Sequence, residues 1–331
     1  MSNQNPLFAE SIIIDGLDTS KWGSETVYRT LRDGGVTAIN ATIAIWDDYE
    51  STLHNITRYL EWFEEFKALI SPVKSVNDIR LAKAENRTGI ILGWQNATPI
   101  GNELHRLRLF HELGVRVIQI TYNERNLLGN GCYERTDDGL SRFGLAAVEE
   151  MNRLGILIDL SHVGDRTTLD TIEHSSCPVA ITHANARSQI DHPRNKTDEA
   201  IKLLVERGGV IGANAFPMFF NRGFETELDE YLEAIDYLVQ MVGIDNVAVG
   251  TDFCMEQPRS FFEWLFMSQG KVAAPEVAYT PEPYHHLRGF ESPADWIKVA
   301  HGLLERNYSE TDAKKVLGEN WLRLFGEVWS K

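Results

Sequence analysis

The sequence predicts a single closed barrel of eight parallel strands, with a helix after each strand, over residues 1–331. Eight short runs rich in β-branched and apolar residues alternate with stretches of helical periodicity. Several of these runs are apolar throughout, as expected of strands that are covered on both faces. Eight units of about 30–40 residues favour a (β/α)8 barrel, because an open sheet of five or six strands would leave two runs unexplained. No linker, repeat or change of composition divides the chain.

Each strand is expected where a β-rich run ends in a polar residue. The predicted strands span residues 11–17, 36–43, 89–95, 115–122, 156–162, 178–183, 209–214 and 247–252. Helices are predicted at residues 25–33, 55–68, 104–113, 144–154, 165–174 and 198–207, followed by two closing helices at 293–306 and 310–329. Gly155 and the pair Gly208–Gly209 stand where two of these helices end, because glycine readily adopts the left-handed conformation of a helix cap.

Residues 253–290 break this regular alternation. The segment is long, rich in aromatic residues and punctuated by proline, which predicts a loop or lid after the eighth strand. Two interpretations stay open: a packed loop or subunit contact, or an apolar wall over the active site that is able to hold a cationic ligand. The aromatic residues concerned are Phe261, Phe262, Trp264, Phe266, Tyr279 and Tyr284.

The composition excludes several classes of protein. The 331 residues include 48 acidic and 32 basic side chains, and the formal net charge of −16 opposes binding to nucleic acid or to anionic lipid. The three cysteines form no CxxC pair, which argues against a disulfide framework. No apolar run is long enough to span a membrane, and the N-terminus lacks the features of a signal peptide. We therefore expect a soluble, cytoplasmic protein without nucleic-acid or membrane partners.

Polar residues at the predicted strand ends define a candidate site, since function in such barrels collects at the carboxyl ends of the strands. His162 and His183 end the fifth and sixth strands, where two neutral imidazoles can converge on one metal ion. Asp252 ends the eighth strand and is a candidate third ligand or general base. The simpler alternative is that each histidine is a hydrogen-bonded core residue.

Arg194 lies in a turn-like loop after the sixth strand, where a fixed guanidinium would clamp a substrate carboxylate. The alternative for Arg194 is a surface salt bridge. Cys254 is interpreted as a small buried apolar side chain rather than a ligand or nucleophile. His285 and His286 are adjacent in the long loop, and a surface pair is favoured over a contribution to the site from above.

Five motifs run along most of the chain: Met151–Gly155 (MNRLG) leading into Asp159–His162 (DLSH), Ile181–His183 (ITH), His192–Asn195 (HPRN), Gly250–Phe253 (GTDF) and Gly318–Arg323 (GENWLR). Taken together they resemble the membrane (renal) dipeptidase family, peptidase family M19. The resemblance implies a barrel of the amidohydrolase type that is usually dimeric and uses two zinc ions to cleave dipeptides, with tolerance for a D-residue at the C-terminal position.

The same resemblance implies roles for four residues. His162 and His183 stand at the positions of the histidines that bind the β metal. Arg194 stands at the position of the arginine that recognises the dipeptide carboxylate, and Asp252 at that of the acid–base aspartate.

Other positions depart from the family pattern. The first strand ends in the letters DGLDT, so Leu17 and Thr19 stand where the family has the His and Asp that bind the α metal. Gln95 replaces the bridging glutamate, and Tyr122 replaces a substrate-binding histidine. Leucine cannot bind a metal and a neutral amide is a poor bridge. The α-metal site is therefore expected to be absent, unless a shift by one residue offers Asp18 instead.

The main hypothesis is a dipeptidase-like amidohydrolase with a reduced metal site. One divalent metal, with zinc as the first choice, would be held by His162 and His183, with Gln95 as a weaker further ligand. A single zinc can still lower the pKa of its bound water to about 7. A site that binds no metal stays open as well.

In this hypothesis Asp252 carries the proton and Tyr122 donates a hydrogen bond to the developing oxyanion. Arg194 and Asn123 bind a small substrate that has a carboxylate and a C–N bond, namely a dipeptide or an N-acyl amino acid. The protein is expected to be a homodimer. Two alternatives use the same barrel: a non-hydrolytic lyase or isomerase, and a catalytically inert binding protein.

Overall fold

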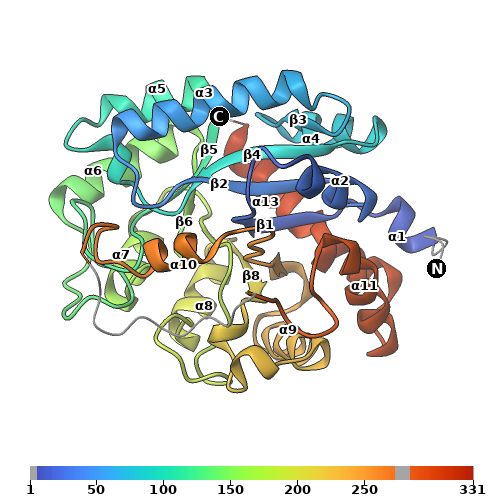
Figure 1. Cartoon of the computed structure of the whole chain (residues 1–331). Helices are drawn as coiled ribbons and strands as arrows, with labels where there is room; N and C mark the ends of the chain where they lie inside the picture. The colour runs from blue at the N-terminus through green and yellow to red at the C-terminus, as the bar shows by residue number, and fades with distance from the viewer. Residues whose placement is uncertain (1–5, 273–283, 331) are drawn as a thin grey trace.

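The structure is a computed structural model of the chain, and it describes residues 6–272 and 284–330 (Figure 1). Eight parallel strands form a barrel with helices around it, so the predicted fold class is confirmed. In their order around the barrel the strands are β1 (Ile14–Asp18), β2 (Ala38–Ala44), β4 (Thr88–Trp94), β5 (Val115–Gln119), β6 (Leu157–Asp159), β7 (Ala180–Ile181), β8 (Val210–Asn214) and β9 (Val247–Gly250).

The barrel closes between β9 and β1, just beyond the last residues of β9. Asp18 pairs with Phe253 in a parallel bridge. The Thr19 N–H donates to the Phe253 carbonyl at 2.7 Å, and the Asp252 N–H donates to the Leu17 carbonyl at 3.0 Å. The carboxyl ends of the first and last strands are therefore neighbours.

The outer helices begin and end at residues suited to those positions. In α6 (Arg142–Leu154) the Ser141 side chain caps the first turn, and Gly155 ends the helix with a left-handed φ of 70°. The predicted bounds 25–33 and 165–174 agree with the structure. The other helices of the outer layer are α2 (Glu25–Asp33), α3 (Tyr49–Glu65), α5 (His105–Leu113), α7 (Asp165–His174), α8 (Asp198–Glu206) and α11 (Trp296–Glu305).

Besides the short helix α1 (Pro6–Glu10), three elements around the barrel were missed from the sequence. Strand β3 (Ile70–Pro72) pairs with β4 outside the barrel order, and its three residues carry too little periodicity to be recognised. Helix α4 (Val76–Ala84) begins at a capping box formed by Ser75 and Asp78. Helix α9 (Leu228–Val242) is amphipathic and covers β8 and β9, so its pattern was present in the sequence.

Strands β6 and β7 are shorter than the predicted 156–162 and 178–183, because the chain turns around a carboxylate. Asp159 Oδ1 accepts from the N–H of Ser161 at 3.1 Å and from that of Thr182 at 2.9 Å. These two N–H groups bond to a side chain instead of to a neighbouring strand. The turns carry His162 and His183 past the ends of the strands to the top of the barrel.

The other end of the barrel is closed by the C-terminal segment. The predicted helix 310–329 is divided into α12 (Glu310–Lys314), a π-helical turn (Lys315–Glu319) and α13 (Asn320–Trp329). The Trp321 indole donates to the Val249 carbonyl at 2.9 Å. Its ring leaves no room for a Cβ at Gly16 or Gly212. This packing joins α13 to the barrel interior.

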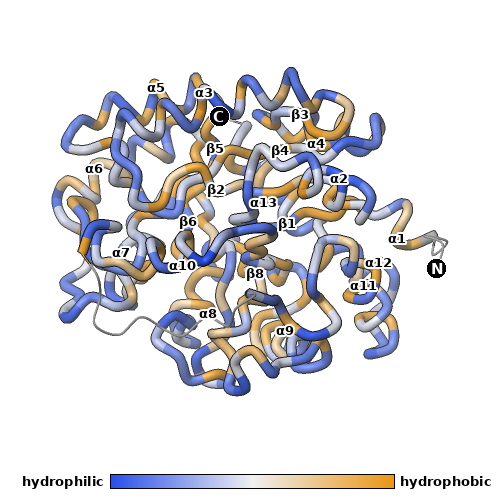
Figure 2. The backbone as a smooth tube through the Cα atoms, viewed as in Figure 1, coloured by the Kyte–Doolittle hydropathy of each residue, from blue (hydrophilic) through white to orange (hydrophobic). Residues whose placement is uncertain are grey.

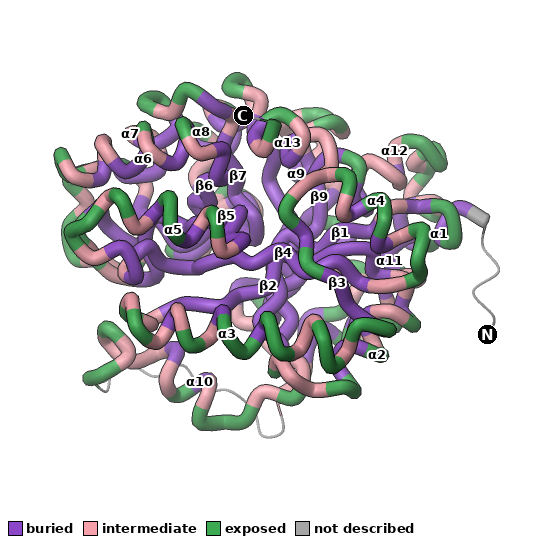
Figure 3. The backbone as a smooth tube through the Cα atoms, turned by 90° about the horizontal axis from the view of Figure 1, so that it is seen from above, coloured by how far each residue is buried: buried purple, intermediate pink, exposed green. Residues whose placement is uncertain are grey.

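Hydropathy and burial follow the barrel architecture. Figure 2 shows apolar residues along the strands, and Figure 3 shows the strands as the buried centre with exposed faces on the surrounding helices. None of the helices within residues 6–272 and 284–330 is long and apolar enough to cross a membrane.

The predicted loop at 253–290 contains a short helix, α10 (Arg259–Leu265), that the sequence reading did not separate from the loop. Residues 273–283 of this segment, with Tyr279, lie outside the described residues. Phe262 and Leu265 belong to one apolar cluster with Tyr122 and Phe216. The described part of the segment therefore packs over the barrel, as the interpretation of an apolar wall requires.

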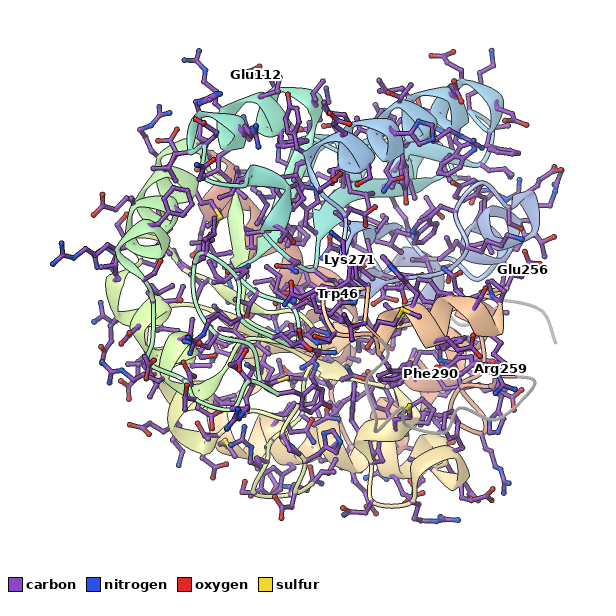
Figure 4. All side chains as sticks on the ribbon, turned by 60° about the vertical axis from the view of Figure 1, so that its left-hand side comes forward. Trp46, Glu112, Glu256, Arg259, Lys271 and Phe290 are labelled. Carbon is purple, nitrogen blue, oxygen red and sulfur yellow. The ribbon has the colours of Figure 1, made fainter. Side chains whose placement is uncertain are left out.

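Two further contacts hold this wall in place. The Trp46 indole donates to the Leu265 carbonyl at 3.2 Å, and Figure 4 shows Trp46 beside Lys271. Glu124 Oε2, from the loop after β5, accepts from Ser268 Oγ at 3.0 Å and from Gln269 Nε2 at 2.9 Å. The segment is thus tied to loops that follow two different strands.

Candidate active site

His162 and His183 meet at the top of the barrel, beyond the ends of β6 and β7. Their Nε2 atoms are 3.2 Å apart, and both rings are buried. Burial lowers the pKa of each imidazole well below its usual value, and the positive charge of Arg194 lowers it further. Both rings are therefore neutral at neutral pH, which is the state in which imidazole binds a metal.

The hydrogen bond on the far side of the His162 ring fixes its proton. Asn123 Oδ1 lies 2.7 Å from His162 Nδ1. An amide oxygen only accepts, so Nδ1 of His162 carries the proton and its Nε2 presents a lone pair. Asn123 was predicted to bind substrate. In the structure it holds His162, and its contact with substrate stays a prediction.

The proton on His183 follows from a chain of hydroxyl groups behind the ring. Ser161 Oγ donates to Asp159 Oδ1 at 2.6 Å. Ser161 has no second proton to donate. In the contact of 3.1 Å between Ser161 Oγ and Thr182 Oγ1, the Thr182 hydroxyl is therefore the donor. Thr182 Oγ1 can then only accept from His183 Nδ1, which lies 2.7 Å away. While Asp159 is ionised, His183 also presents a lone pair at Nε2.

Two lone pairs that face each other at 3.2 Å repel, unless a proton or a metal ion lies between them. Two imidazole nitrogens that bind one tetrahedral zinc at about 2.0–2.1 Å would be separated by about 3.3 Å. The spacing of His162 and His183 is close to that value. The histidine pair therefore fits one metal ion, and each ring is also a buried, hydrogen-bonded side chain, so the simpler alternative stays open.

The end of β1 does not fit a second metal. Leu17 is buried and has no ligand atom in its side chain. Thr19 Oγ1 donates to the Phe253 carbonyl at 3.0 Å and lies 2.8 Å from Cys254 Sγ. The polar atoms at this position are thus engaged with the protein itself.

Gln95 and Asp18 each keep one buried side-chain oxygen without a partner among the described residues. Gln95 Nε2 donates to Thr42 Oγ1 at 3.0 Å, and its Oε1 has no partner among the described residues. Asp18 Oδ1 accepts from the Ser20 N–H at 2.7 Å, and burial raises the pKa of Asp18 to about 7. Within the described ranges, no group of three or more His, Cys, Asp and Glu side chains is placed to hold a metal. The expected loss of the α-metal site stays a prediction.

Asp252 lies at the end of β9, on a backbone with a left-handed φ of 57° that is uncommon for a residue other than glycine. Asn214 joins it to the histidine pair: its Nδ2 donates to the His183 carbonyl at 3.1 Å and contacts Asp252 Oδ2 at 3.4 Å. Burial raises the pKa of Asp252 to about 6, against the opposing effect of Arg194. A carboxylate with this pKa exchanges a proton readily near neutral pH.

Arg194 is fully buried, so the interpretation of a surface salt bridge is wrong. Its guanidinium donates to the carbonyls of Ser161 at 2.5 Å and His183 at 2.9 Å, and it lies 5.3 Å from the centre of the Phe219 ring. Its Nε has no partner among the described residues. Arg194 therefore braces the two histidine turns, and recognition of a substrate carboxylate stays a prediction.

Tyr122 stacks on His162 with 4.2 Å between the ring centres, and the Trp46 ring meets it edge-on at 5.0 Å. Burial raises the pKa of Tyr122 well above its usual value, so the hydroxyl keeps its proton and stays a hydrogen-bond donor. This is the property that the predicted oxyanion role needs.

Sequence reasoning missed the residues that orient the histidines. Asp159, Ser161 and Thr182 form the hydroxyl chain behind His183, and Gln119 accepts from the His162 N–H at 3.3 Å. The signal was present, because three of these residues lie inside the motifs DLSH and ITH. Their roles need the turn geometry, which the letters alone do not give.

Two other expectations can be compared with the structure. Cys254 is buried, as expected of a small apolar side chain. His286 is also buried, and its Nε2 accepts from the Cys254 N–H at 3.0 Å, so the interpretation of His285 and His286 as a surface pair is wrong for His286. Phe253 packs edge-on against the His286 ring, with 4.6 Å between the ring centres, and helps to bury it.

A closed parallel barrel that carries two converging histidines and an aspartate at its strand ends is the arrangement that the resemblance implies for the amidohydrolase type. The family model described as Membrane dipeptidase (Peptidase family M19) matches residues 3–262, and the chain belongs to this family. The predicted family and the predicted barrel are confirmed.

Curated relatives are similar over about three quarters of the chain. The dipeptidase tcpJ of Claviceps purpurea (strain 20.1) is 25% identical over 255 residues, which are 76% of this chain and 54% of that protein. The chain thus matches about half the length of this relative. The uncharacterized protein in the pqqA 5' region of Klebsiella pneumoniae is 27% identical, over 78% of this chain and 88% of that protein.

Solved structures extend the similarity to nearly the whole chain. An amidohydrolase from Pseudomonas aeruginosa is 38% identical with a TM-score of 0.93, and 98% of each chain is covered. A metallo peptidase from Rhodobacter sphaeroides, solved with a phosphinate mimic of the dipeptide L-Ala-D-Ala, is 20% identical with a TM-score of 0.81, and it covers 97% of this chain and 100% of that one. The second likeness shows the fold alone.

Proposed function

We propose that this chain hydrolyses a C–N bond in a small substrate that carries a carboxylate, either a dipeptide or an N-acyl amino acid. The observation that carries the proposal is the meeting of His162 and His183 at 3.2 Å beside Asp252, whose pKa is about 6. The names of the relatives, dipeptidase and amidohydrolase, support this reaction class.

One divalent metal fits the site, and zinc is our first choice. His162 and His183 would hold it, with the unpartnered Oε1 of Gln95 as a weaker further ligand. When bound, such an ion polarises a carbonyl and lowers the pKa of water. Asn123 and Thr182 accept hydrogen bonds from the Nδ1 atoms of His162 and His183. These bonds hold the proton of each ring at Nδ1 and leave both Nε2 lone pairs free.

The remaining residues have roles that follow from their contacts. Above a pH of about 6, Asp252 is ionised and accepts the proton of the attacking water. It then returns that proton to the nitrogen that leaves when the C–N bond breaks. The Tyr122 hydroxyl, which stays protonated, donates to the oxygen that becomes negative in the transition state. Arg194 and Asn123 are proposed to bind the substrate carboxylate.

The first experiment measures metal content by elemental mass spectrometry on protein purified without chelators or metal-affinity resin. The same preparation is assayed against dipeptides and N-acyl amino acids in water enriched in oxygen-18. About one metal per chain and incorporation of labelled oxygen into the carboxylate product would support hydrolysis at a reduced site. Turnover without the label would indicate a lyase or isomerase, and tight binding without product would indicate a binding protein.

Two further properties are proposed from the family and the composition. We propose a homodimer, which sedimentation equilibrium tests directly, because a mass equal to the chain mass of 37.5 kDa would contradict it. We also propose a cytoplasmic location, and recovery of the protein in a membrane or secreted fraction would overturn this.

A further inference from the structure

A cavity of about 390 Å³ lies at the barrel rim, between the loop after β1, the end of β2, helix α3 and helix α10. Its size is in the range of small-molecule sites. Five aromatic side chains contribute to its wall: Trp22, Tyr59, Trp62, Phe261 and Trp264. Such a wall suits a flat or flexible apolar group.

The charges around the cavity argue against a cationic occupant. Lys21 and His54 are exposed at its lining, and Arg58 lies 5.4 Å from the centre of the Trp62 ring. Asp47 is the one acid among its lining residues, and both of its oxygens are engaged: Oδ2 accepts from the Ile45 N–H at 3.1 Å, and Oδ1 accepts from Asn55 Nδ2 at 3.0 Å. Lys21 and Arg58 outnumber the one lining acid, whose two oxygens already accept hydrogen bonds, so a neutral apolar group fits better than an ammonium group.

A chain of hydrogen bonds along the barrel rim links the cavity to the histidine pair. Thr42 lines the cavity, and its Oγ1 accepts from Gln95 Nε2 at 3.0 Å. Gln119 donates to the Gln95 carbonyl and accepts from the His162 N–H. These four residues end or follow β2, β4, β5 and β6, so three strand spacings, about 14 Å along the rim, separate the cavity from the pair.

The Arg194 guanidinium stands at the other side of the histidines, in contact with the carbonyls of Ser161 and His183. A substrate whose carboxylate faces Arg194 and whose C–N bond lies at the pair has its other end directed toward β2. That end must be long enough to cross the rim before it reaches the aromatic wall. A free α-amino group next to the scissile bond would end short of the wall.

We propose that this cavity binds the end of the acyl group of an N-acyl amino acid, and that the acyl group is a long alkyl chain, with or without a terminal aromatic ring. The inference rests on the proposed function and names its substrate class. It selects acyl amino acids over dipeptides, because the wall is aromatic and its two cations, Lys21 and Arg58, outnumber its one acid.

The test is a series of N-acyl alanines with acetyl, octanoyl, dodecanoyl and tetradecanoyl groups, assayed beside Ala-Ala. Once the chain is long enough to cross the rim, burial of each added methylene is expected to raise kcat/KM about threefold to fourfold until the cavity is filled. In Trp62→Ala the ratio of kcat/KM for tetradecanoyl over acetyl should fall at least tenfold, as roughly expected for the loss of an aromatic wall. Phe261→Ala gives a second test of the wall if Trp62→Ala does not fold.

Trp329→Ala is the matched control. Trp329 is also a partly exposed tryptophan on a helix, but it stacks on Phe325 in α13 at the closed end of the barrel. Its removal should leave the dependence on acyl length unchanged. A fall of the ratio in Trp329→Ala equal to that in Trp62→Ala would overturn the assignment of the cavity.

The outcomes separate this inference from the proposed function. Hydrolysis of Ala-Ala together with no gain along the acyl series would overturn the acyl cavity and leave the hydrolase intact. Binding of N-tetradecanoyl-alanine by calorimetry without hydrolysis, weakened in Trp62→Ala but not in Trp329→Ala, would keep the cavity and overturn the function. Neither turnover nor binding that depends on acyl length would overturn both.

Discussion

The two sides of the barrel top are built from similar polar residues, but they differ in where the lone pairs of those residues point. On the β6 and β7 side, Asn123 and Thr182 occupy the far nitrogens of the histidines, so that two lone pairs point at one place. On the β1 side, Thr19 contacts Cys254 and the backbone of Phe253. The first side directs two lone pairs at one place, whereas the β1 side uses the Thr19 hydroxyl for its own structure and leaves one oxygen of Asp18 without a partner among the described residues.

This difference shows that a metal site depends on what holds the ligands as much as on the ligands themselves. A histidine whose far nitrogen is fixed presents its lone pair without loss of rotational freedom. A polar side chain that already has protein partners must break those bonds before it binds an ion. The comparison predicts large effects for variants on the β6 and β7 side and small ones on the β1 side.

The largest effect is expected for His162→Ala. Removal of one of two imidazoles leaves too few ligands for a divalent metal, so bound metal and hydrolysis should both fall at least about a hundredfold. Gln95→Ala is the matched variant from the opposite side, and a neutral amide as a weak ligand predicts a loss of metal affinity of at most about tenfold. Elemental mass spectrometry and kcat/KM measure both. Equal losses in the two variants would show that the two sides do not differ as described.

Asp252→Asn is expected to have the next largest effect. Loss of a general base costs typically about 10²–10⁴ in rate, so kcat/KM should fall in this range while the metal stays bound. Because the pKa of Asp252 is raised to about 6, wild-type kcat/KM should rise as the pH increases through that value and then level off. The acid limb should disappear from the residual activity of the variant. An unchanged pH profile would assign the limb to another group.

Thr182→Val tests the hydroxyl chain behind His183. Valine has the shape of threonine but cannot accept from His183 Nδ1, which lies 2.7 Å from Thr182 Oγ1. Loss of such an outer partner typically weakens metal binding about 10–100-fold. Thr182→Ser keeps the hydroxyl and should restore most of the affinity. Titration with a competing chelator measures the change, and failure of serine to rescue would point to a packing effect instead.

The barrel and the main site residues could be predicted from the sequence because each rests on local information. Apolar runs that end in a polar residue give the strands, and His162, His183 and Asp252 each end or follow one of them. The loss of ligands at Leu17 and Thr19 is visible from side-chain chemistry alone. Such features need no knowledge of how distant segments pack.

Other features depend on contacts between distant segments and could not be read in this way. The burial of Arg194 and His286 results from packing against Phe219 and Phe253, which lie elsewhere in the chain. The proton positions on the histidines require the turns that Asp159 builds by bonding to Ser161 and Thr182. The predicted lengths of β6 and β7 were too long for the same reason, because these side-chain hydrogen bonds end both strands early.

The smallest effect is expected at Asp18, on the β1 side, and it concerns stability rather than activity. Asp18 is fully buried, its Oδ2 has no partner among the described residues, and burial raises its pKa from 3.8 to about 7. A raised pKa means that the folded state favours the protonated carboxyl. The stability from this group is therefore fully present below pH 3.8 and is lost as the pH rises through about 7.

Asp18→Asn replaces the carboxyl by a group that stays neutral at every pH. The variant should be more stable than the wild type at pH 8, by roughly 1–3 kcal/mol, and its free energy of unfolding should decline less between pH 5 and pH 8. Urea unfolding at several pH values measures both quantities. Asp138→Asn, at a side chain that is 81% exposed, is the control and should leave the pH dependence unchanged. If Asp18→Asn and Asp138→Asn behave alike, or if Asp18→Asn loses bound metal, then the carboxylate on the β1 side takes part in the site and the contrast between the two sides does not hold.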